Sequence, residues 1–226
     1  MNINLKERKK LNMKFKFKDF LISQKKEKYW KNIEIILKKK NLVPKKELVF
    51  NAFLNFDFNE IKLVIIGQDP YPTNNNADGL CFSSNNKKTP SSLKNIFLEI
   101  KNSYPNSEFK TNNLQYWKNQ GVLLLNSILT TEKNKTLAHK NQGWEIFNIN
   151  LLSEILKEKH DVLFLAMGKD ALLFLNKLDI DKMNIFSTPH PSPLSCWRGF
   201  FNSNVFKKIN DKLKSLNKKE IDWNTK

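Results

Sequence analysis

Polar residues that can do chemistry follow the apolar runs of this sequence. Gln68 and Asp69 come directly after one run, Asn126 closes the next, and His190 follows the last. A carboxylate can stabilise positive charge, an amide can donate and accept hydrogen bonds, and an imidazole can stabilise a developing anion. Taken singly, each also has a structural explanation, as a turn-capping aspartate, an amide that binds backbone, or a histidine that ends a strand.

The apolar runs predict four buried strands, because they are aliphatic or β-branched on both faces. Helical stretches lie between them. The predicted strands are 61–67, 122–127, 162–168 and 183–188, and the predicted helices include 91–102, 144–159, 170–177 and 204–216. This alternating order predicts an α/β fold with three α/β/α layers around a central four-stranded, mainly parallel sheet.

In such a sheet, the ligand crevice lies outside the carboxyl ends of the strands. Chemically interesting residues follow all four predicted strands, at 68–71, at Asn126, at 168–170 and at 190–195. We therefore expect the four segments to converge on one crevice.

Composition limits the class of protein. The 226 residues fit one domain, and a hydrophobic fraction of 40% is enough for a sizeable core. No apolar run is long enough to cross a bilayer, and the N-terminal segment does not resemble a secretion signal. Cys81 and Cys196 are too few and too far apart for an iron–sulfur cluster, so we expect free thiols and no metal site.

The formal net charge of +17 indicates a polyanionic partner such as nucleic acid. The same lysine excess is what an AT-rich genome would impose on any protein, so charge alone leaves both explanations open. Residues 1–18 are predicted to be a basic, flexible tail, and residues 19–226 a single catalytic domain.

Several motifs, in this order and with these separations, resemble the family 1 uracil-DNA glycosylases. They are GQDPYP (67–72), GLCFSS (79–84), LLLN (123–126) and HPSPLS (190–195). The similarity extends through TPSSLKNI (89–96), AHKNQGWEIF (138–147) and RGFF (198–201), and thus covers roughly residues 51–208. One such motif would mean little, but the ordered set is highly specific.

The resemblance implies roles for two catalytic residues. Asp69 would lie beneath the sugar, where its carboxylate stabilises the cation and orients a water molecule. His190 would be a neutral hydrogen-bond donor to O2 of the departing uracil anion.

The resemblance also implies a uracil-binding set. Asn126 would donate to O4 and accept from N3–H of uracil, an edge on which cytosine presents the opposite pattern. Phe82 would stack on the flipped base, and Tyr71 would stand against C5, where the methyl group of thymine would clash. Gln68 would contribute mainly positioning contacts.

The remaining motif residues match loops that handle DNA. Leu194 matches an exposed wedge that fills the space left by the extruded base, and Ser92, Ser192 and Ser195 match hydroxyls that grip phosphates. Lys169 takes a position where the family commonly has serine, and His139 matches a histidine near the DNA backbone. Each serine, considered alone, is more commonly a turn residue.

The sequence departs from the family pattern beside the first motif. Pro72 and Asp78 stand where histidines are usual. These changes put the rate in doubt more than the reaction type.

We therefore expect an enzyme without cofactor or metal, monomeric and cytoplasmic, that removes uracil from single- and double-stranded DNA and binds a phage-type inhibitor protein. The alternative is a DNA-binding scaffold or processivity subunit that keeps the fold without turnover.

Overall fold

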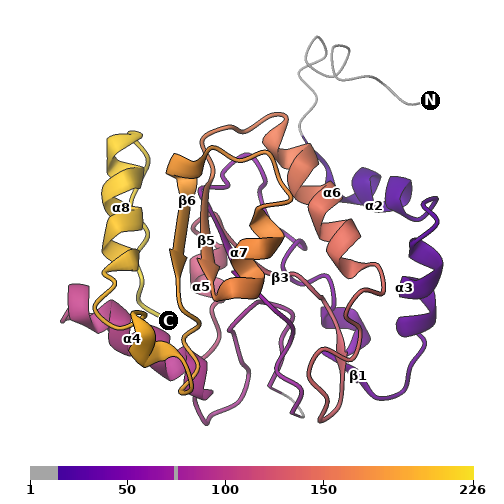
Figure 1. Cartoon of the computed structure of the whole chain (residues 1–226), viewed down its shortest axis with the longest axis horizontal. Coiled ribbons are helices and arrows are strands. Elements are labelled where there is room, and N and C mark those ends of the chain that lie inside the picture. Colours follow the sequence, from indigo (N-terminus) through magenta and orange to yellow (C-terminus); the bar gives the residue numbers. More distant parts are fainter. Residues whose placement is uncertain (1–14, 74–75) are drawn as a thin grey trace.

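The computed structural model describes residues 15–73 and 76–226 (Figure 1). Its helices are α2 (Phe17–Gln24), α3 (Trp30–Ile36), α4 (Ser91–Ser103), α5 (Gln115–Lys118), α6 (Trp144–Leu156), α7 (Lys169–Leu175) and α8 (Val205–Ser215). Its strands are β1 (Leu42–Val43), β2 (Leu63–Gly67), β3 (Val122–Asn126), β4 (Thr131–Glu132), β5 (Leu163–Met167) and β6 (Ile185–Thr188). Short 3-10 turns cover Lys46–Leu48, Lys182–Asn184 and Cys196–Arg198.

A four-stranded parallel sheet with the order β3-β2-β5-β6 forms the centre of the molecule. In β2, one of the two inner strands, Ile65 lies opposite Leu124 of β3 on one side and Leu165 of β5 on the other. Every residue of β2, β3 and β5 is buried. Helices flank the sheet, so the predicted α/β architecture is confirmed.

The prediction for the fourth strand was wrong in two respects. β6 begins at Ile185 and not at Met183, because the Asp181 side chain accepts the N–H of Met183 at 2.9 Å and forms a 3-10 turn there. Its residues are half-buried or exposed, unlike those of the other edge strand, β3, which are all buried. Figure 1 shows α8 alongside this edge strand.

The segment before β2 adds a layer that periodicity did not predict. Helices α2 and α3 lie at the end of the molecule opposite α8 (Figure 1). An aromatic cluster attaches α2, in which Phe17 stacks on Phe53 with a ring separation of 4.7 Å. A small antiparallel sheet of β1 and β4 pairs Leu42 with Glu132 and so joins this segment to the middle of the chain.

The predicted tail of residues 1–18 falls mostly outside the described residues. Its last part is folded, since Phe15 and Phe17 pack against the core and α2 begins at Phe17. One hydrophobic cluster then extends from Phe20 to Trp223. Within the described residues, no helix has the length and apolar character needed to cross a membrane.

Glu99 joins α4 to the segment that leads into α8. It is 1% exposed, and its carboxylate accepts hydrogen bonds from the N–H groups of Asn202 and Asn204, both at 2.8 Å, and from the Ser203 hydroxyl at 3.1 Å. Glu99 thus fixes the segment that leads from the Cys196–Arg198 turn into α8.

We predict that Glu99→Ala lowers the free energy of unfolding by about 3 kcal/mol, since three donors lose a charged acceptor in a buried place. Denaturant unfolding followed by circular dichroism measures this loss. Glu108→Ala is the matched control, because Glu108 pairs with Lys110 at the exposed surface and its removal should cost less than about 1 kcal/mol. Equal losses in the two variants would contradict the assignment.

Candidate active site

A pocket of about 160 Å³ opens at the carboxyl end of the sheet. It collects residues that follow β2, end β3 and follow β6, as the crevice rule predicts. All six predicted catalytic and uracil-binding residues line it, and they are Gln68, Asp69, Tyr71, Phe82, Asn126 and His190. Ser92, at the start of α4, also lines the pocket.

The segment after β5 contributes to the pocket indirectly. Gly168 and Asp170 do not line it, but Asp170 accepts a hydrogen bond from Gln68 Nε2. Gly168 has a φ of 106°, and a Cβ there would lie 3.1 Å from His190 Cβ. The segment after β5 therefore lies against two pocket residues, Gln68 and His190, without lining the pocket itself.

Asp69 lies two residues beyond the end of β2, with its side chain half-buried. Its Oδ2 accepts a hydrogen bond from the backbone N–H of Leu137 at 2.6 Å. Burial raises the pKa of Asp69, and the hydrogen bond from Leu137 opposes that rise. A partly desolvated carboxylate interacts with nearby positive charge more strongly than one in water.

Asn126 ends β3 directly opposite Gly67. A Cβ at position 67 would collide with Asn126 Oδ1 and with Cys81 Cβ, so the absence of a side chain there makes room for the amide. On α6, Asn148 Nδ2 donates to the backbone oxygens of Asn126 and Ser127, both at 3.0 Å. The backbone at the end of β3 is therefore held in place, and 6% of Asn126 is exposed at the pocket.

Two aromatic residues shape another part of the pocket. Phe82 is 9% exposed and has a φ of 62°, a left-handed conformation that is rare for a bulky residue and must be held by its surroundings. The Tyr71 hydroxyl donates to the backbone oxygen of Phe82 at 3.2 Å. Burial raises the pKa of Tyr71, so its phenol stays protonated.

His190 lies 5.9 Å from Phe82, measured between the ring centroids. The N–H of Ser192 donates to Nδ1 of His190 at 3.0 Å, which assigns the ring proton to Nε2. Burial lowers the pKa of His190, and the charge of Asp170 partly opposes this. The structure thus favours a neutral imidazole that donates through Nε2.

The segment after His190 projects from the molecule beside the pocket. Leu194 is 89% exposed at its tip, and Trp197 is 81% exposed three residues later. The Ser192 and Ser195 hydroxyls are 2.8 Å apart, and that of Ser195 donates to the His190 backbone oxygen. In this structure, the two serines thus stabilise the turn that presents Leu194.

Comparisons with known proteins identify the family. A family model for the uracil DNA glycosylase superfamily matches residues 55–214. The chain belongs to the uracil-DNA glycosylase superfamily.

Individual relatives give the same result. A uracil-DNA glycosylase of Mesomycoplasma hyopneumoniae is 43% identical over 218 residues, which cover 95% of this chain and 100% of the relative. One from Buchnera aphidicola is also 43% identical, over 92% of this chain and 97% of the relative. The crystal structure of mimivirus uracil-DNA glycosylase has a TM-score of 0.82 at 29% identity, over 99% of this chain and 90% of that one. The reaction of this chain is therefore the excision of uracil in DNA repair, by hydrolysis of an N-glycosyl bond.

One departure from the usual glycosylase motif, Asp78, has a structural explanation. This residue is 1% exposed and lies behind the pocket, where its carboxylate accepts from the N–H of Leu80 at 3.1 Å, from the Ser83 hydroxyl and from Asn113 Nδ2 at 3.0 Å. Burial raises its pKa. Asp78 therefore supports the turn that carries Phe82 and does not itself line the pocket.

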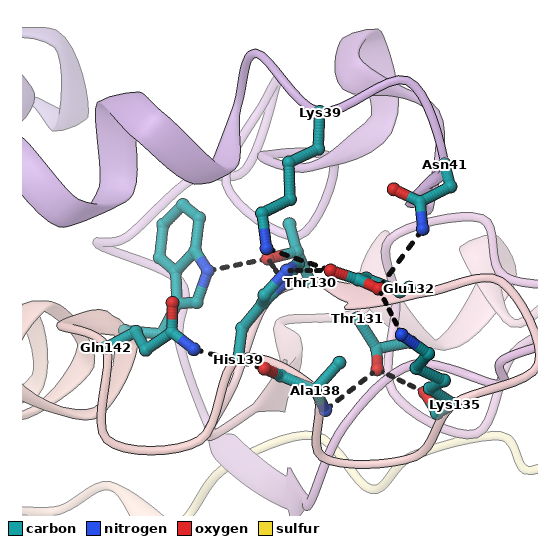
Figure 2. Close-up of polar contacts among 10 residues, drawn as sticks. Lys39, Asn41, Thr130, Thr131, Glu132, Lys135, Ala138, His139 and Gln142 are labelled. Atoms are coloured by element: carbon teal, nitrogen blue, oxygen red, sulfur yellow. Dashed lines mark hydrogen bonds and ion pairs between the residues drawn. The ribbon is translucent and has the colours of Figure 1, made fainter.

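His139 and Lys169 are not brought into the pocket. Lys169 is exposed at the start of α7. His139 is completely buried, so in this structure its side chain is not at a surface where DNA could contact it. Its Nδ1 lies 2.9 Å from the Thr130 hydroxyl, which also accepts the indole N–H of Trp144 at 2.7 Å (Figure 2).

Among the residues of this glycosylase site that sequence reasoning missed are two from the segment after β4. Thr136 lines the pocket, and Leu137 donates its backbone N–H to Asp69. Neither residue type carries a catalytic signal. The positive φ of Leu137, 57°, is also invisible in the sequence, because turns of this kind are usually marked by glycine or asparagine.

We predict that His190 is neutral and protonated on Nε2 at pH 7, and that it becomes charged only as the pH falls below the ordinary imidazole range. Two-bond 1H–15N correlation spectra of the uniformly labelled protein distinguish the tautomers, with His190→Gln to assign the signals. A charged ring, or one protonated on Nδ1, at pH 7 would contradict the assignment.

Proposed function

We propose that this chain acts on uracil flipped out of the DNA helix, with the base bound in the pocket between Phe82, Asn126 and His190. The observation that carries the proposal is the arrangement of a carboxylate, an amide and a neutral imidazole donor around a pocket of about 160 Å³. A base within a duplex cannot reach such a pocket, so it must leave the stack.

In the proposed mechanism, the bond between N1 of uracil and C1′ of the sugar breaks, and its electron pair leaves with the base. His190 Nε2–H donates to the uracil O2 as negative charge develops there. Asp69 stabilises the positive sugar and accepts a proton from the water that adds to C1′. The uracil anion then takes up a proton from the solvent and Asp69 releases the one that it accepted, so the products are free uracil and an abasic site. No step requires a metal or cofactor.

Base selection is assigned to Asn126 and Tyr71. Asn126 matches the O4 and N3–H pattern of uracil, and the wrong base would leave buried polar groups unpaired. Tyr71 would meet the 5-methyl group of thymine. Gln68 would position the loop that carries Asp69, since its side chain bonds Asp170.

The DNA contacts are assigned to the surface beside the pocket. Leu194 would enter the helix where the base has left, because it is a large apolar residue held at an exposed tip. Ser92, Ser192 and Ser195 would bind phosphates, which requires the last two to exchange their mutual hydrogen bond for one to DNA. Lys169 would add a point charge, and His139, being buried, would act on DNA only through the backbone that it holds.

The proposal extends to partners. A solved variant of the mimivirus enzyme is in complex with UGI, at a TM-score of 0.84 and 30% identity over 99% of this chain. We propose that this chain acts as a monomer on single- and double-stranded DNA in the cytoplasm, and that a phage-type inhibitor protein binds the same surface. The alternative of a scaffold without turnover has less support, since Asp69, Tyr71, Asn126 and His190 all line one pocket.

We predict that the purified protein releases uracil from a uracil-containing oligonucleotide and that Asp69→Asn and His190→Ala each lower kcat by on the order of 100-fold or more. The matched controls are Asp211→Asn on α8 and His160→Ala, which replace exposed residues of the same types. Gel analysis of strands cleaved at abasic sites measures the rate. Intact uracil-containing strands after incubation with the wild type would refute the proposal and favour the scaffold.

We predict that Tyr71→Ala gains measurable release of thymine from a T-containing strand, because the space opposite C5 opens. Tyr71→Phe keeps the ring and loses only the hydrogen bond to Phe82, so it should continue to exclude thymine. Chromatography of the released bases compares the two. Thymine release by Tyr71→Phe at the level of Tyr71→Ala would show that the ring is not the steric barrier.

A further inference from the structure

The Asp69 segment is held by a loop that lies more than sixty residues further along the chain. This 132–140 loop comprises residues 132–140, from the end of β4 onward. Its residue Leu137 donates its N–H to Asp69 Oδ2 at 2.6 Å, and its residue Asn134 donates its N–H to the Pro72 oxygen at 2.9 Å. The first bond holds the Asp69 carboxylate, and the second holds the backbone three residues further on.

The 132–140 loop is closed by hydrogen bonds near its start. The N–H of Lys135 donates to the Glu132 oxygen at 3.0 Å, and the Thr131 hydroxyl donates to the Lys135 oxygen. The N–H of Ala138 returns to the same hydroxyl at 3.3 Å. Between these contacts, Leu137 has a φ of 57°, which is unfavourable for leucine and persists only where the surroundings impose it.

The Glu132 side chain anchors the start of this loop, as Figure 2 shows. Its carboxylate accepts hydrogen bonds from Lys39 at 2.8 Å, Asn41 at 3.1 Å and Lys135 at 3.0 Å. The side chain is only 13% exposed. The bonds from Lys39 and Lys135 lower the pKa of Glu132 to about 2, so it is ionised throughout the working pH range.

His139 anchors the end of the same loop. Its side chain is fully buried, and its Nε2 lies 3.8 Å from Glu132 Oε1 without a hydrogen bond of its own (Figure 2). Burial, assisted by the charge of Lys39, lowers the pKa of His139, so it is neutral at physiological pH. Glu132 and His139 thus meet at the base of the loop, with Leu137 on the span between them.

We propose that Glu132 is a positioning residue for Asp69: its bonds to Lys39 and Asn41 fix the 132–140 loop so that the Leu137 N–H stays on Oδ2. This rests on the catalytic role of Asp69 proposed above. Lys39 and Asn41 belong to the N-terminal segment and do not line the pocket. Through Glu132 they would nevertheless help to orient the Asp69 carboxylate.

Loss of the Glu132 contacts should shift the pKa of Asp69 in one direction, which simple destabilisation of the fold would not do. The Leu137 hydrogen bond favours the ionised form of Asp69 against the effect of burial. The other titratable groups of the pocket are Tyr71 and His190, and the charged groups of the anchor are Glu132, Lys39 and Lys135. When the N–H withdraws, the pKa of Asp69 rises and a smaller fraction is ionised at low pH.

The first test needs no substrate. The amide signal of Leu137 in 1H–15N spectra should titrate with Asp69, and in Glu132→Gln its midpoint should move to higher pH while its hydrogen exchange accelerates. Lys39→Met should act in the same way, whereas Lys39→Arg, which keeps a donor, should restore wild-type behaviour. The matched control is Asp211→Asn, which removes the acid of the Lys207–Asp211 pair, also 2.8 Å long but exposed on α8.

The second test uses turnover. Glu132→Gln should lower kcat for uracil release about tenfold with little change in KM, and should move the acid limb of the kcat profile to higher pH. An unshifted Leu137 midpoint in a folded Glu132→Gln protein, or a uniform loss of kcat with the acid limb unmoved, would overturn the proposal. A wild type that releases no uracil would refute the proposed function, while the amide titration would still test the positioning.

Discussion

The pairing of Gly67 with Asn126 at the carboxyl end of the parallel sheet is the constraint on which the site depends. Parallel pairing ends β2 and β3 at the same edge, so the segment that carries Asp69 emerges beside the amide that ends the neighbouring strand. Only glycine leaves space for this amide, because a side chain at position 67 would meet both Asn126 and Cys81. A change of one residue in register would turn Asn126 to the other face of the sheet, and the pocket would lose its only polar strand-end side chain among the described residues that line it.

Burial shifts the pKa values of two pocket groups, Asp69 and His190, in opposite directions. Desolvation disfavours charge on both Asp69 and His190, which raises the pKa of the first and lowers that of the second. The two are then distinguished by backbone N–H groups. Leu137 donates to the carboxylate and favours its charged form, whereas Ser192 donates to Nδ1 of the imidazole and is compatible only with an unprotonated nitrogen there. A backbone N–H thus favours the charged form of Asp69 and a neutral ring protonated on Nε2 at His190.

The strands could be predicted from local signals, because runs such as LVIIG and VLLLN are apolar on both faces. The pocket-lining side chains could be predicted only from the ordered set of family motifs, because each polar residue, taken singly, also has a structural explanation. Helices α2 and α3 were missed because aromatic contacts over long sequence distances, such as Phe17 on Phe53, hold them. Leu137 was missed for a different reason: it acts through a backbone N–H, which every residue except proline possesses. His139 was expected near DNA because its motif was matched, but the motif does not report which side of the loop the ring faces.

The loss of two histidines beside the first motif does not require the loss of the reaction. At position 78 the side chain points into the protein, where three donors from Leu80, Ser83 and Asn113 suit a carboxylate, which only accepts, better than an imidazole. At position 72, proline lacks an N–H, yet its carbonyl oxygen still binds the N–H of Asn134 and keeps the Asp69 segment against the 132–140 loop. Both replacements therefore preserve contacts that support the pocket. Neither of them removes one of its proposed reacting groups. His190, the histidine that lines the pocket and that the proposed mechanism uses, is retained.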